Sequence, residues 1–250
     1  ITGEHFLRKV LEKSELFGRS QTRATVLFLA GHSLIAGDNL LTAEEGLGCL
    51  EESLSIWREL GQDYYLDEAK CLFIQGFIQQ RYLSEIPGNE DLGYQIMRES
   101  IKTFQEAGNL WWHAWAVNLT TYYEEKHKDM QAYRELLKDE ILLWQKTGNP
   151  WGAAMPIMDW GHYALKHGLL MEAQEYLLKS LSIFQELDSA GMIMQIARDL
   201  GHIARAFQEF DQSEAYLDHC LALCCDLGLD DPVNRTRCAR GFIALHKCDE

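Results

Sequence analysis

Three glycine–histidine pairs recur along the chain and carry imidazoles of a kind that binds metals or moves protons. The pairs are Gly31-His32, Gly161-His162 and Gly201-His202. The last two stand 40 residues apart. In a chain of stacked repeats, that separation places their helices about 10 Å apart, whereas a shared metal needs each nitrogen within about 2 Å of the ion. We therefore interpret the histidines as a repeat signature that hydrogen-bonds locally, and predict no metal site from them.

The seven cysteines are the second set of residues with chemical potential. Cys220 and Cys224 have the spacing of one half of a zinc site, but no matching second half follows. Small buried apolar side chains are the simpler interpretation. The odd count and the lack of a secretory signal favour a reduced, cytoplasmic setting. The chain opens without Met on ITGEHFLRKV, which we interpret as a piece of a longer protein.

No catalytic motif stands out. The sequence has no G-x-x-x-x-G-K-[ST] phosphate loop, and no Ser-His-Asp or Cys-His set in a strand-turn context. No pair of carboxylates falls in a pocket-forming loop. We therefore predict a protein that is not an enzyme and that needs no cofactor.

Composition narrows the class of protein further. The 250 residues include 38 acidic and 23 basic side chains, for a formal net charge of −15, and only 4 prolines. This charge disfavours direct binding to nucleic acid, which needs clustered Lys and Arg. No apolar run approaches the ~20 residues of a membrane helix, so we predict no membrane contact. The scarcity of proline and of alternating β-branched residues predicts a mostly helical fold.

A repeat of about 40 residues positions these side chains. A turn marker recurs at Gly108, Gly148, Asp188 and Gly228 in steps of 40, preceded by Gly61 and Gly18 at steps of 47 and 43. A second column of small residues follows the turn markers: Gly31, Gly76, Thr121, Gly161, Gly201 and Gly241. Each repeat holds two stretches with apolar residues at helical spacing. Such hairpins bury their apolar faces only by stacking, so the pattern predicts a solenoid.

The predicted architecture is all-α, with about twelve helices in one solenoid. Five full repeats are expected at 21–61, 64–108, 111–148, 151–188 and 190–228, flanked by half-repeats at 4–17 and 232–247. The half-repeats are either the cut ends of a longer protein or true caps. Within the third repeat, Tyr133 stands where the pattern has a small residue and puts close packing of that helix pair in doubt.

The glycine column, the small residue 12 positions later and the repeated helix pairs resemble the tetratricopeptide repeat, whose usual period is about 34 residues. The longer period resembles the repeats of bacterial STAND ATPases, including LuxR-type activators related to the maltose-regulon activator and AfsR-like regulators. The resembling segments are SQTRATVLFLAGHSLIAGD at 20–38, EESLSIWRELGQD at 51–63 and GNPWGAAMPIMDWGHYALKHG at 148–168. The resemblance implies a right-handed α-α superhelix, and places the ATPase and DNA-binding modules outside these residues.

In tetratricopeptide solenoids, the first helix of each pair lines a concave groove. Carried over to this chain, that implies an aromatic and Met-rich floor with a basic C-terminal end, suited to a peptide or small ligand with an anionic group. Each aromatic residue is as readily explained by packing between helices. The candidate ligand contacts are Phe73, Phe77, Trp115, Asn118, Tyr122, Met158, His162, Arg198, His202, Arg205 and Arg235.

We therefore expect a non-enzymatic module of a larger bacterial signalling or transcription regulator. It would bind a protein, a peptide segment or a small anionic or apolar inducer in its groove. The alternative is a structural or oligomerisation scaffold without a small ligand, whose groove is filled by the chain's own segments.

Overall fold

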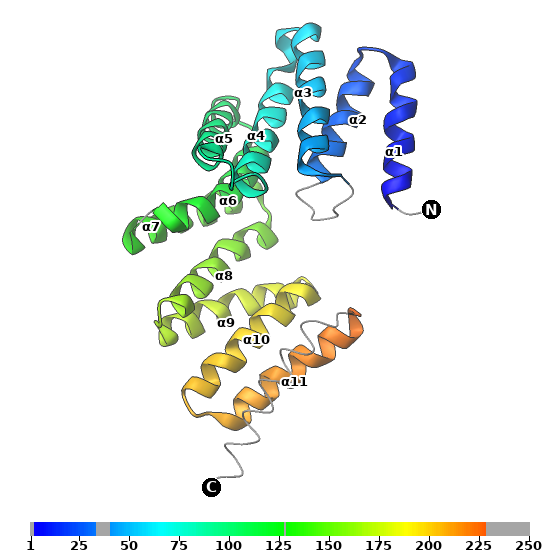
Figure 1. Cartoon of the computed structure of the whole chain (residues 1–250). Coiled ribbons are helices and arrows are strands. Elements are labelled where there is room, and N and C mark those ends of the chain that lie inside the picture. The colour runs from blue at the N-terminus through cyan, green and yellow to red at the C-terminus, as the bar shows by residue number, and fades with distance from the viewer. Residues whose placement is uncertain (1–2, 34–40, 128, 229–250) are drawn as a thin grey trace. The chain divides into compact units, whose positions relative to one another are not determined.

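The computed structural model describes residues 3–33, 41–127 and 129–228, and every regular element within these ranges is a helix (Figure 1). The prediction of an all-α helical-repeat fold is therefore confirmed for this part of the chain. The predicted half-repeat at 232–247 lies outside the described residues. In chain order the helices are α1 (Gly3–Ser14), η1 (Glu15–Phe17), α2 (Gln21–His32), α3 (Ala43–Leu60), η3 (Gln62–Tyr64), α4 (Tyr65–Arg81), α5 (Asn89–Glu106), α6 (Leu110–His127), α7 (Met130–Thr147), α8 (Pro150–Lys166), α9 (Leu170–Glu186), α10 (Ala190–Ala206) and α11 (Phe210–Asp226).

The turns between hairpins take the conformation that the turn markers require. Gly108, Gly148 and Gly228 have φ of 67°, 71° and 67°, a left-handed region that glycine enters without a steric penalty. Asp188 occupies the same place with φ of 51°. Its short polar side chain is one of the few that tolerate this conformation. The recurring turn therefore explains why the marker can change from glycine to aspartate and to little else.

Side-chain caps start the helices that follow two of these turns. Asn109 Oδ1 accepts the backbone N–H of Trp112 at 3.2 Å, and Asn149 Oδ1 accepts that of Gly152 at 3.1 Å. Each cap satisfies a backbone donor that has no partner within its own helix. Asp63 follows the turn marker Gly61 in the same way, but it lies inside η3 and caps no helix.

Within the hairpins, the glycine column brings two helices into close contact. A Cβ built at Gly76 would lie 2.6 Å from the carbonyl oxygen of Gly93 on the partner helix. At Gly161 it would lie 2.8 Å from Cγ of Leu177. Neither distance is compatible with a real side chain. Glycine is therefore required for α4 to pack on α5, and for α8 to pack on α9, as closely as they do.

The described helices form two compact units, one containing α1 to α6 and one containing α7 to α11. The third predicted repeat is divided between them, since α6 belongs to the first unit and α7 to the second. This is the repeat in which Tyr133 replaces the small residue of the pattern. Tyr133 packs within the second unit, with its ring centroid 4.7 Å from that of Tyr163 and 6.3 Å from that of Trp160.

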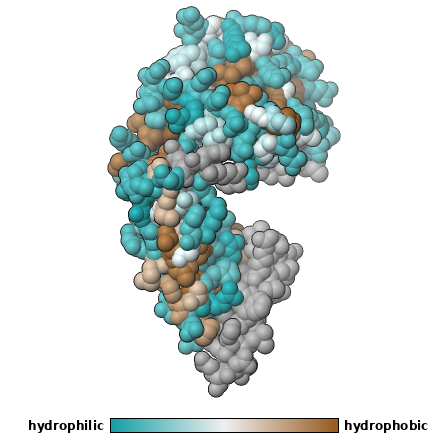
Figure 2. Space-filling view, turned by 60° about the vertical axis from the view of Figure 1, so that its left-hand side comes forward, coloured by the Kyte–Doolittle hydropathy of each residue, from teal (hydrophilic) through white to brown (hydrophobic). Residues whose placement is uncertain are grey.

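The face drawn in Figure 2 is mostly hydrophilic, and its hydrophobic residues lie in separate patches. None of the described helices is both long enough and apolar enough to cross a bilayer.

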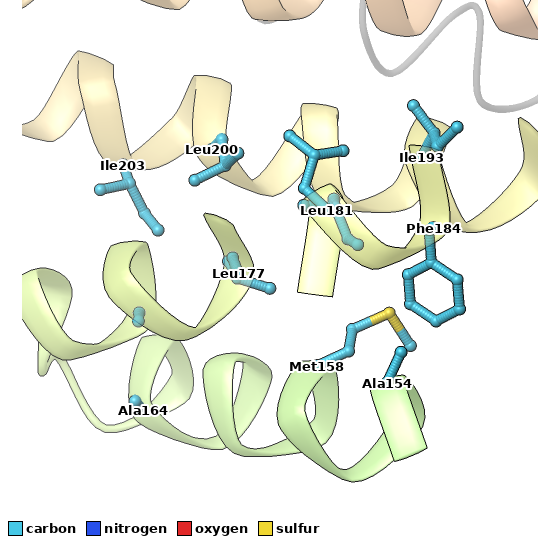
Figure 3. Close-up of a cluster of buried hydrophobic side chains, with 11 residues drawn as sticks. Ala154, Met158, Ala164, Leu177, Leu181, Phe184, Ile193, Leu200 and Ile203 are labelled. Carbon is cyan, nitrogen blue, oxygen red and sulfur yellow. The ribbon is translucent and has the colours of Figure 1, made fainter. Parts of the chain in front are cut away.

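Each unit has its own apolar core, built from both helices of its hairpins. In the first unit the core includes Leu50, Ala69, Phe73, Ile74, Ile78, Met97, Phe104 and Ala116. In the second unit, α8, α9 and α10 contribute a cluster in which Leu177 and Phe184 of α9 lie between the other two helices (Figure 3). The cluster comprises Ala154, Met158, Ala164, Ala173, Leu177, Leu181, Phe184, Ile193, Ile196, Leu200 and Ile203.

The close approach at the glycine column generates a stability prediction. Gly76→Ala forces the backbones of α4 and α5 apart and lowers the free energy of unfolding by about 1–3 kcal/mol, as overpacking does. Gly48 offers a matched control in the middle of α3, because a Cβ there meets nothing within 4 Å. Gly48→Ala raises the free energy of unfolding by about 0.5–1 kcal/mol through helix propensity. Urea denaturation measures both changes, and equal effects of the two variants would contradict the packing.

Candidate functional site

A pocket of about 510 Å³ lies in the second unit between α8 and α10, each of which is the first helix of its repeat. Three of the predicted ligand contacts, Met158, His162 and Arg198, come together in its lining. The complete lining is Met158, Asp159, His162, Leu165, Lys166, Gln195, Arg198 and Asp199.

Helical spacing and the core position these side chains. Met158 and His162 stand four residues apart on α8, and Gln195 and Arg198 stand three apart on α10, so each pair shares a helix face. Met158 is 4% exposed and belongs to the same apolar cluster as Leu200. The floor of the pocket is therefore part of the core, while its wall is polar.

A nearly buried carboxylate organises the polar wall. Asp199 is 7% exposed, and it accepts hydrogen bonds from Arg198 Nε at 2.9 Å and from Arg198 Nη2 at 3.4 Å. From the facing helix, His162 Nε2 lies 3.0 Å from Asp199 Oδ2, although this nitrogen makes no well-aligned hydrogen bond. Burial raises the pKa of the Asp199 carboxyl, but the contacts with His162 and Arg198 outweigh burial and hold the pKa below its ordinary value of 3.8.

Asp199 changes the electrostatic picture drawn from the sequence. Arg198 was predicted to form part of a basic end of the groove, but an acidic residue directly follows it in the chain. The charge of Arg198 is compensated by Asp199, so the pocket is not a simple cationic site. Nη1 of Arg198 has no hydrogen-bond partner among the described residues. Those N–H groups can still donate to a carboxylate or a carbonyl of a ligand.

His202 and Arg205 continue along α10 but do not line this pocket. Both side chains are partly exposed. Burial lowers the pKa of His202, and the charge of Arg205 lowers it further. At neutral pH His202 is therefore an uncharged imidazole, and it adds no positive charge to α10.

The predicted aromatic floor takes the form of a cluster in the first unit, built from α2, α4 and α6. The ring of Trp115 stacks on His32 at 5.4 Å and on Trp111 at 5.8 Å, and it contacts Phe73 at 5.8 Å between centroids. Phe73 is fully buried and offers no surface to a ligand, so its role is to support Trp115. Trp111, at 48% exposed, is the most accessible ring of this cluster.

Of the remaining candidates, Phe77 and Asn118 do not line the pocket between α8 and α10. The ring of Phe77 is partly exposed and contacts Tyr82 at 6.3 Å. Asn118 is partly exposed on α6. The side chain of Tyr122 and the whole of Arg235 lie outside the described residues.

The cysteines of α11 have the properties of core residues. Cys220 and Cys224 are buried beside Met194 and Ala197. Burial, together with the neighbouring Cys220, raises the pKa of the Cys224 thiol to about 11. A thiol that stays protonated is a poor nucleophile and metal ligand. Across the described ranges, no three His, Cys, Asp or Glu side chains are grouped so that they could hold a metal ion.

Comparison with known proteins supports the fold and goes no further. No protein-family model matches the sequence, and no curated protein matches it significantly. The structure is similar to the crystal structure of BtubC (BKLC) from P. vanneervenii, with a TM-score of 0.66 and 16% sequence identity. The match covers 84% of this chain and 85% of the BtubC chain. At this level of identity, the similarity establishes an all-helical fold alone.

The Asp199 contacts generate a prediction about stability and pH. Asp199→Asn leaves Arg198 without its carboxylate and lowers the free energy of unfolding at pH 7 by about 1.5–3 kcal/mol, the range for hydrogen bonds to charged groups. Because the folded pKa lies below 3.8, this stabilisation is complete above that value and is lost as the pH falls through the lowered pKa. Urea denaturation from pH 7 to pH 3 therefore shows the two proteins converging in acid.

Asp139→Asn is the matched control, because Asp139 is exposed on α7 of the same unit. It changes the free energy of unfolding by less than about 0.5 kcal/mol at either pH. A difference between Asp199→Asn and the wild type that stays constant with pH would show that the carboxylate is not stabilised by its neighbours.

Proposed function

We propose that this chain is a non-enzymatic binding module, and that the second unit holds a peptide segment or small inducer in the pocket between α8 and α10. The observation that carries the proposal is the convergence of Met158, His162 and Arg198, from two successive repeats, on one pocket of about 510 Å³. Pockets of roughly 300–1,000 Å³ are the usual size for small ligands.

The lining suggests the chemistry of the ligand. Met158 and Leu165 offer an apolar contact, and Gln195 offers an amide. Arg198 offers the donors of Nη1. A ligand that combines an apolar group with a carboxylate or carbonyl oxygen matches this set. Since Asp199 already compensates the charge of Arg198, we expect the acceptor group to add specificity more than affinity.

We further propose that the module belongs to a larger bacterial signalling or transcription regulator. The support for this part is the resemblance of its repeats to those of the STAND regulators. The similarity to BtubC supports the helical fold and carries no functional argument at 16% identity. The adjoining open reading frame tests the assignment, because a phosphate-loop ATPase domain or a helix-turn-helix domain there is the expected finding.

Binding measurements with Arg198 variants test the pocket. A library of acetylated peptides with acidic or free C-terminal carboxylates supplies the probes, and isothermal titration measures each hit. We expect Arg198→Ala to weaken binding about tenfold or more, the loss of a charge-assisted hydrogen bond. Arg198→Lys keeps the charge but loses the planar fork, so it recovers only part of the affinity.

Lys179→Ala is the matched control, since it removes one positive charge from the exposed face of α9, where Lys179 pairs with Glu175 and lies over the ring of Tyr176, away from the pocket lining. It leaves binding unchanged. Equal affinity of the wild type, Arg198→Ala and His162→Ala would exclude the pocket as the binding site. If the protein also sedimented as a discrete dimer, the scaffold alternative would be favoured.

A further inference from the structure

A second pocket, of about 530 Å³, lies in the first unit between α3 and α4. It is independent of the pocket between α8 and α10, which belongs to the other unit. Its wall is one stripe of α3, and its floor carries two glutamines of α4. The lining is Leu47, Glu51, Leu54, Ser55, Arg58, Glu59, Gln75 and Gln79.

The two glutamines lie on the opposite side of α4 from the predicted groove. Gln75 and Gln79 each follow a predicted groove residue, Phe73 or Phe77, by two positions. At 3.6 residues per turn, two positions correspond to about 200° around the helix. The pocket is therefore not part of the aromatic face of α4.

Both glutamine amides lack hydrogen-bond partners in the described part of the chain. Gln75 is only 8% exposed and its side chain makes no hydrogen bond there. Gln79 Oε1 is fully buried and also has no partner. Buried polar groups without partners are rare in folded proteins, because each destabilises the fold by the loss of its hydration. Gln79 Oε1 is such a buried group, and the Gln75 amide, one helical turn away, faces the same pocket without a partner in the described part of the chain.

Like α4, the helices α6, α8 and α10 are each the first helix of a repeat. The positions in them that are equivalent to Gln75 and Gln79 show which residues the repeat normally has there. In α8 they are Trp160 and Ala164, and in α10 they are Leu200 and Ala204. All four side chains are buried in the apolar core. The repeat therefore accepts apolar residues here without difficulty, and α4 departs from that pattern.

In α6 the equivalent positions are polar, but their polar groups have partners. Thr120 donates its hydroxyl to the carbonyl oxygen of Val117 at 2.7 Å. Glu124 accepts the hydroxyl of Tyr94 and lies 3.5 Å from Arg98. Among the described helices α4, α6, α8 and α10, only α4 places unsatisfied amides at these two positions.

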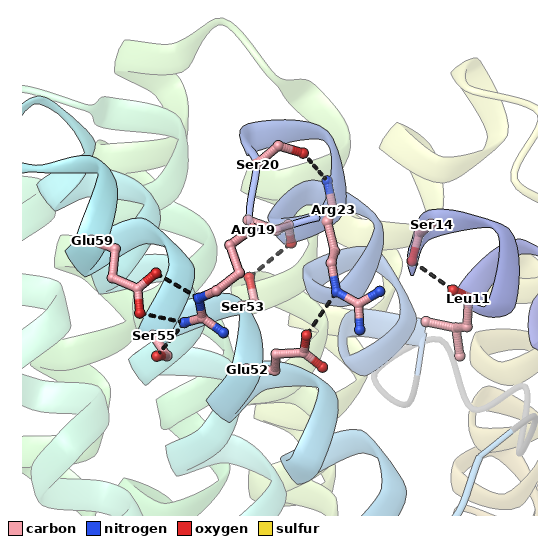
Figure 4. A network of polar contacts seen from close by, with 10 residues as sticks. Leu11, Ser14, Arg19, Ser20, Arg23, Glu52, Ser53, Ser55 and Glu59 are labelled. Carbon is pink, nitrogen blue, oxygen red and sulfur yellow. Dashed lines mark hydrogen bonds and ion pairs between the residues drawn. The ribbon is translucent and has the colours of Figure 1, made fainter. Parts of the chain in front are cut away.

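The charged groups around the pocket are largely committed to each other. Arg19 donates from Nε to Glu59 Oε2 at 2.5 Å and from Nη2 to Ser55 Oγ at 2.7 Å (Figure 4). Arg58 donates to Glu68 at 3.3 Å. Glu51 is exposed and has no ion pair in the described part of the chain. The two amides, with Leu47 and Leu54 beside them, are therefore the groups most available to a ligand.

The chemistry of the carboxamide indicates the ligand class. Each glutamine presents one acceptor oxygen and a donor NH₂. A carboxylate offers only acceptors and an ammonium only donors, so either leaves half of the pair unsatisfied. A peptide group offers both, and an extended segment presents several in a row. We propose that the pocket between α3 and α4 binds an extended peptide segment through its backbone amides, with apolar side chains against Leu47 and Leu54 and a basic side chain near Glu51.

Nuclear magnetic resonance of the ¹⁵N-labelled chain tests the ligand class directly, through the side-chain NH₂ signals of Gln75 and Gln79. The probes are acetamide, acetate, ethylammonium, and a capped tetrapeptide of alanine, leucine, lysine and leucine. We expect acetamide and the tetrapeptide to shift both signals, and the two ions to leave them unchanged. The tetrapeptide binds at least tenfold more tightly than acetamide. Its fully N-methylated form, which lacks the backbone donors, does not bind.

Gln75→Leu and Gln79→Leu separate a binding role from a structural one. Each variant weakens tetrapeptide binding at least tenfold. Gln79→Leu also raises the Tm of the free protein by about 2–8 °C, because it removes a buried oxygen that has no partner in the described part of the chain. The matched control Gln185→Leu, on the exposed surface of α9, changes neither quantity.

Two results would overturn the proposal. One is a lower Tm of the Gln79→Leu variant, which would mean that the Gln79 amide stabilises the free fold. The other is the absence of Gln75 and Gln79 shifts at several millimolar tetrapeptide, or a tetrapeptide affinity no greater than that of acetamide.

Discussion

Close contact between the two helices of a hairpin is the constraint on which the rest of the structure depends. At Gly161 no side chain separates α8 from Leu177 of α9, so the remaining apolar residues of both helices meet in one core. The contact also orients α8. With Gly161 against α9, Met158 and His162, which lie about 60° and 100° from Gly161 on the same side of the helix, line the pocket shared with α10. In the repeat where Tyr133 breaks the pattern, the chain divides into two compact units.

The two pockets differ in how far their polar groups are compensated. In the second unit, Arg198 and His162 compensate the Asp199 carboxylate, although His162 Nε2 makes no well-aligned hydrogen bond. In the first unit, Gln75 and Gln79 have no partners in the described part of the chain. A compensated carboxylate contributes stability, whereas a buried oxygen without a partner, such as Gln79 Oε1, destabilises the free protein and gains most from a ligand that completes its hydrogen bonds.

The sequence predicted those features of the candidate site that depend on contacts close in the chain, and it did not predict those that depend on packing between helices. Met158, His162 and Arg198 were found from their register relative to the glycine column, because register on a helix is a local property. The same reasoning placed Phe73 and Trp115 on one face, but it could not tell that Phe73 is fully buried while Trp115 is partly exposed. That distinction depends on how α2, α5 and α6 pack around α4, and the pattern of one helix carries no information about it.

By itself, the sequence determined the helical class, the period and the conformation of the turns. Gly108 and Gly148 take positive φ, and Asn149 caps its helix, through contacts within a few residues of chain. Only the tertiary structure decided which polar groups are satisfied. His162 reaches Asp199 from a different repeat. Gln79 Oε1 is buried and has no partner in the described part of the chain, and the residues next to Gln79 in the sequence do not indicate this. The physical reason is that burial and charge compensation depend on distances through space between helices, and these are set only when the helices pack.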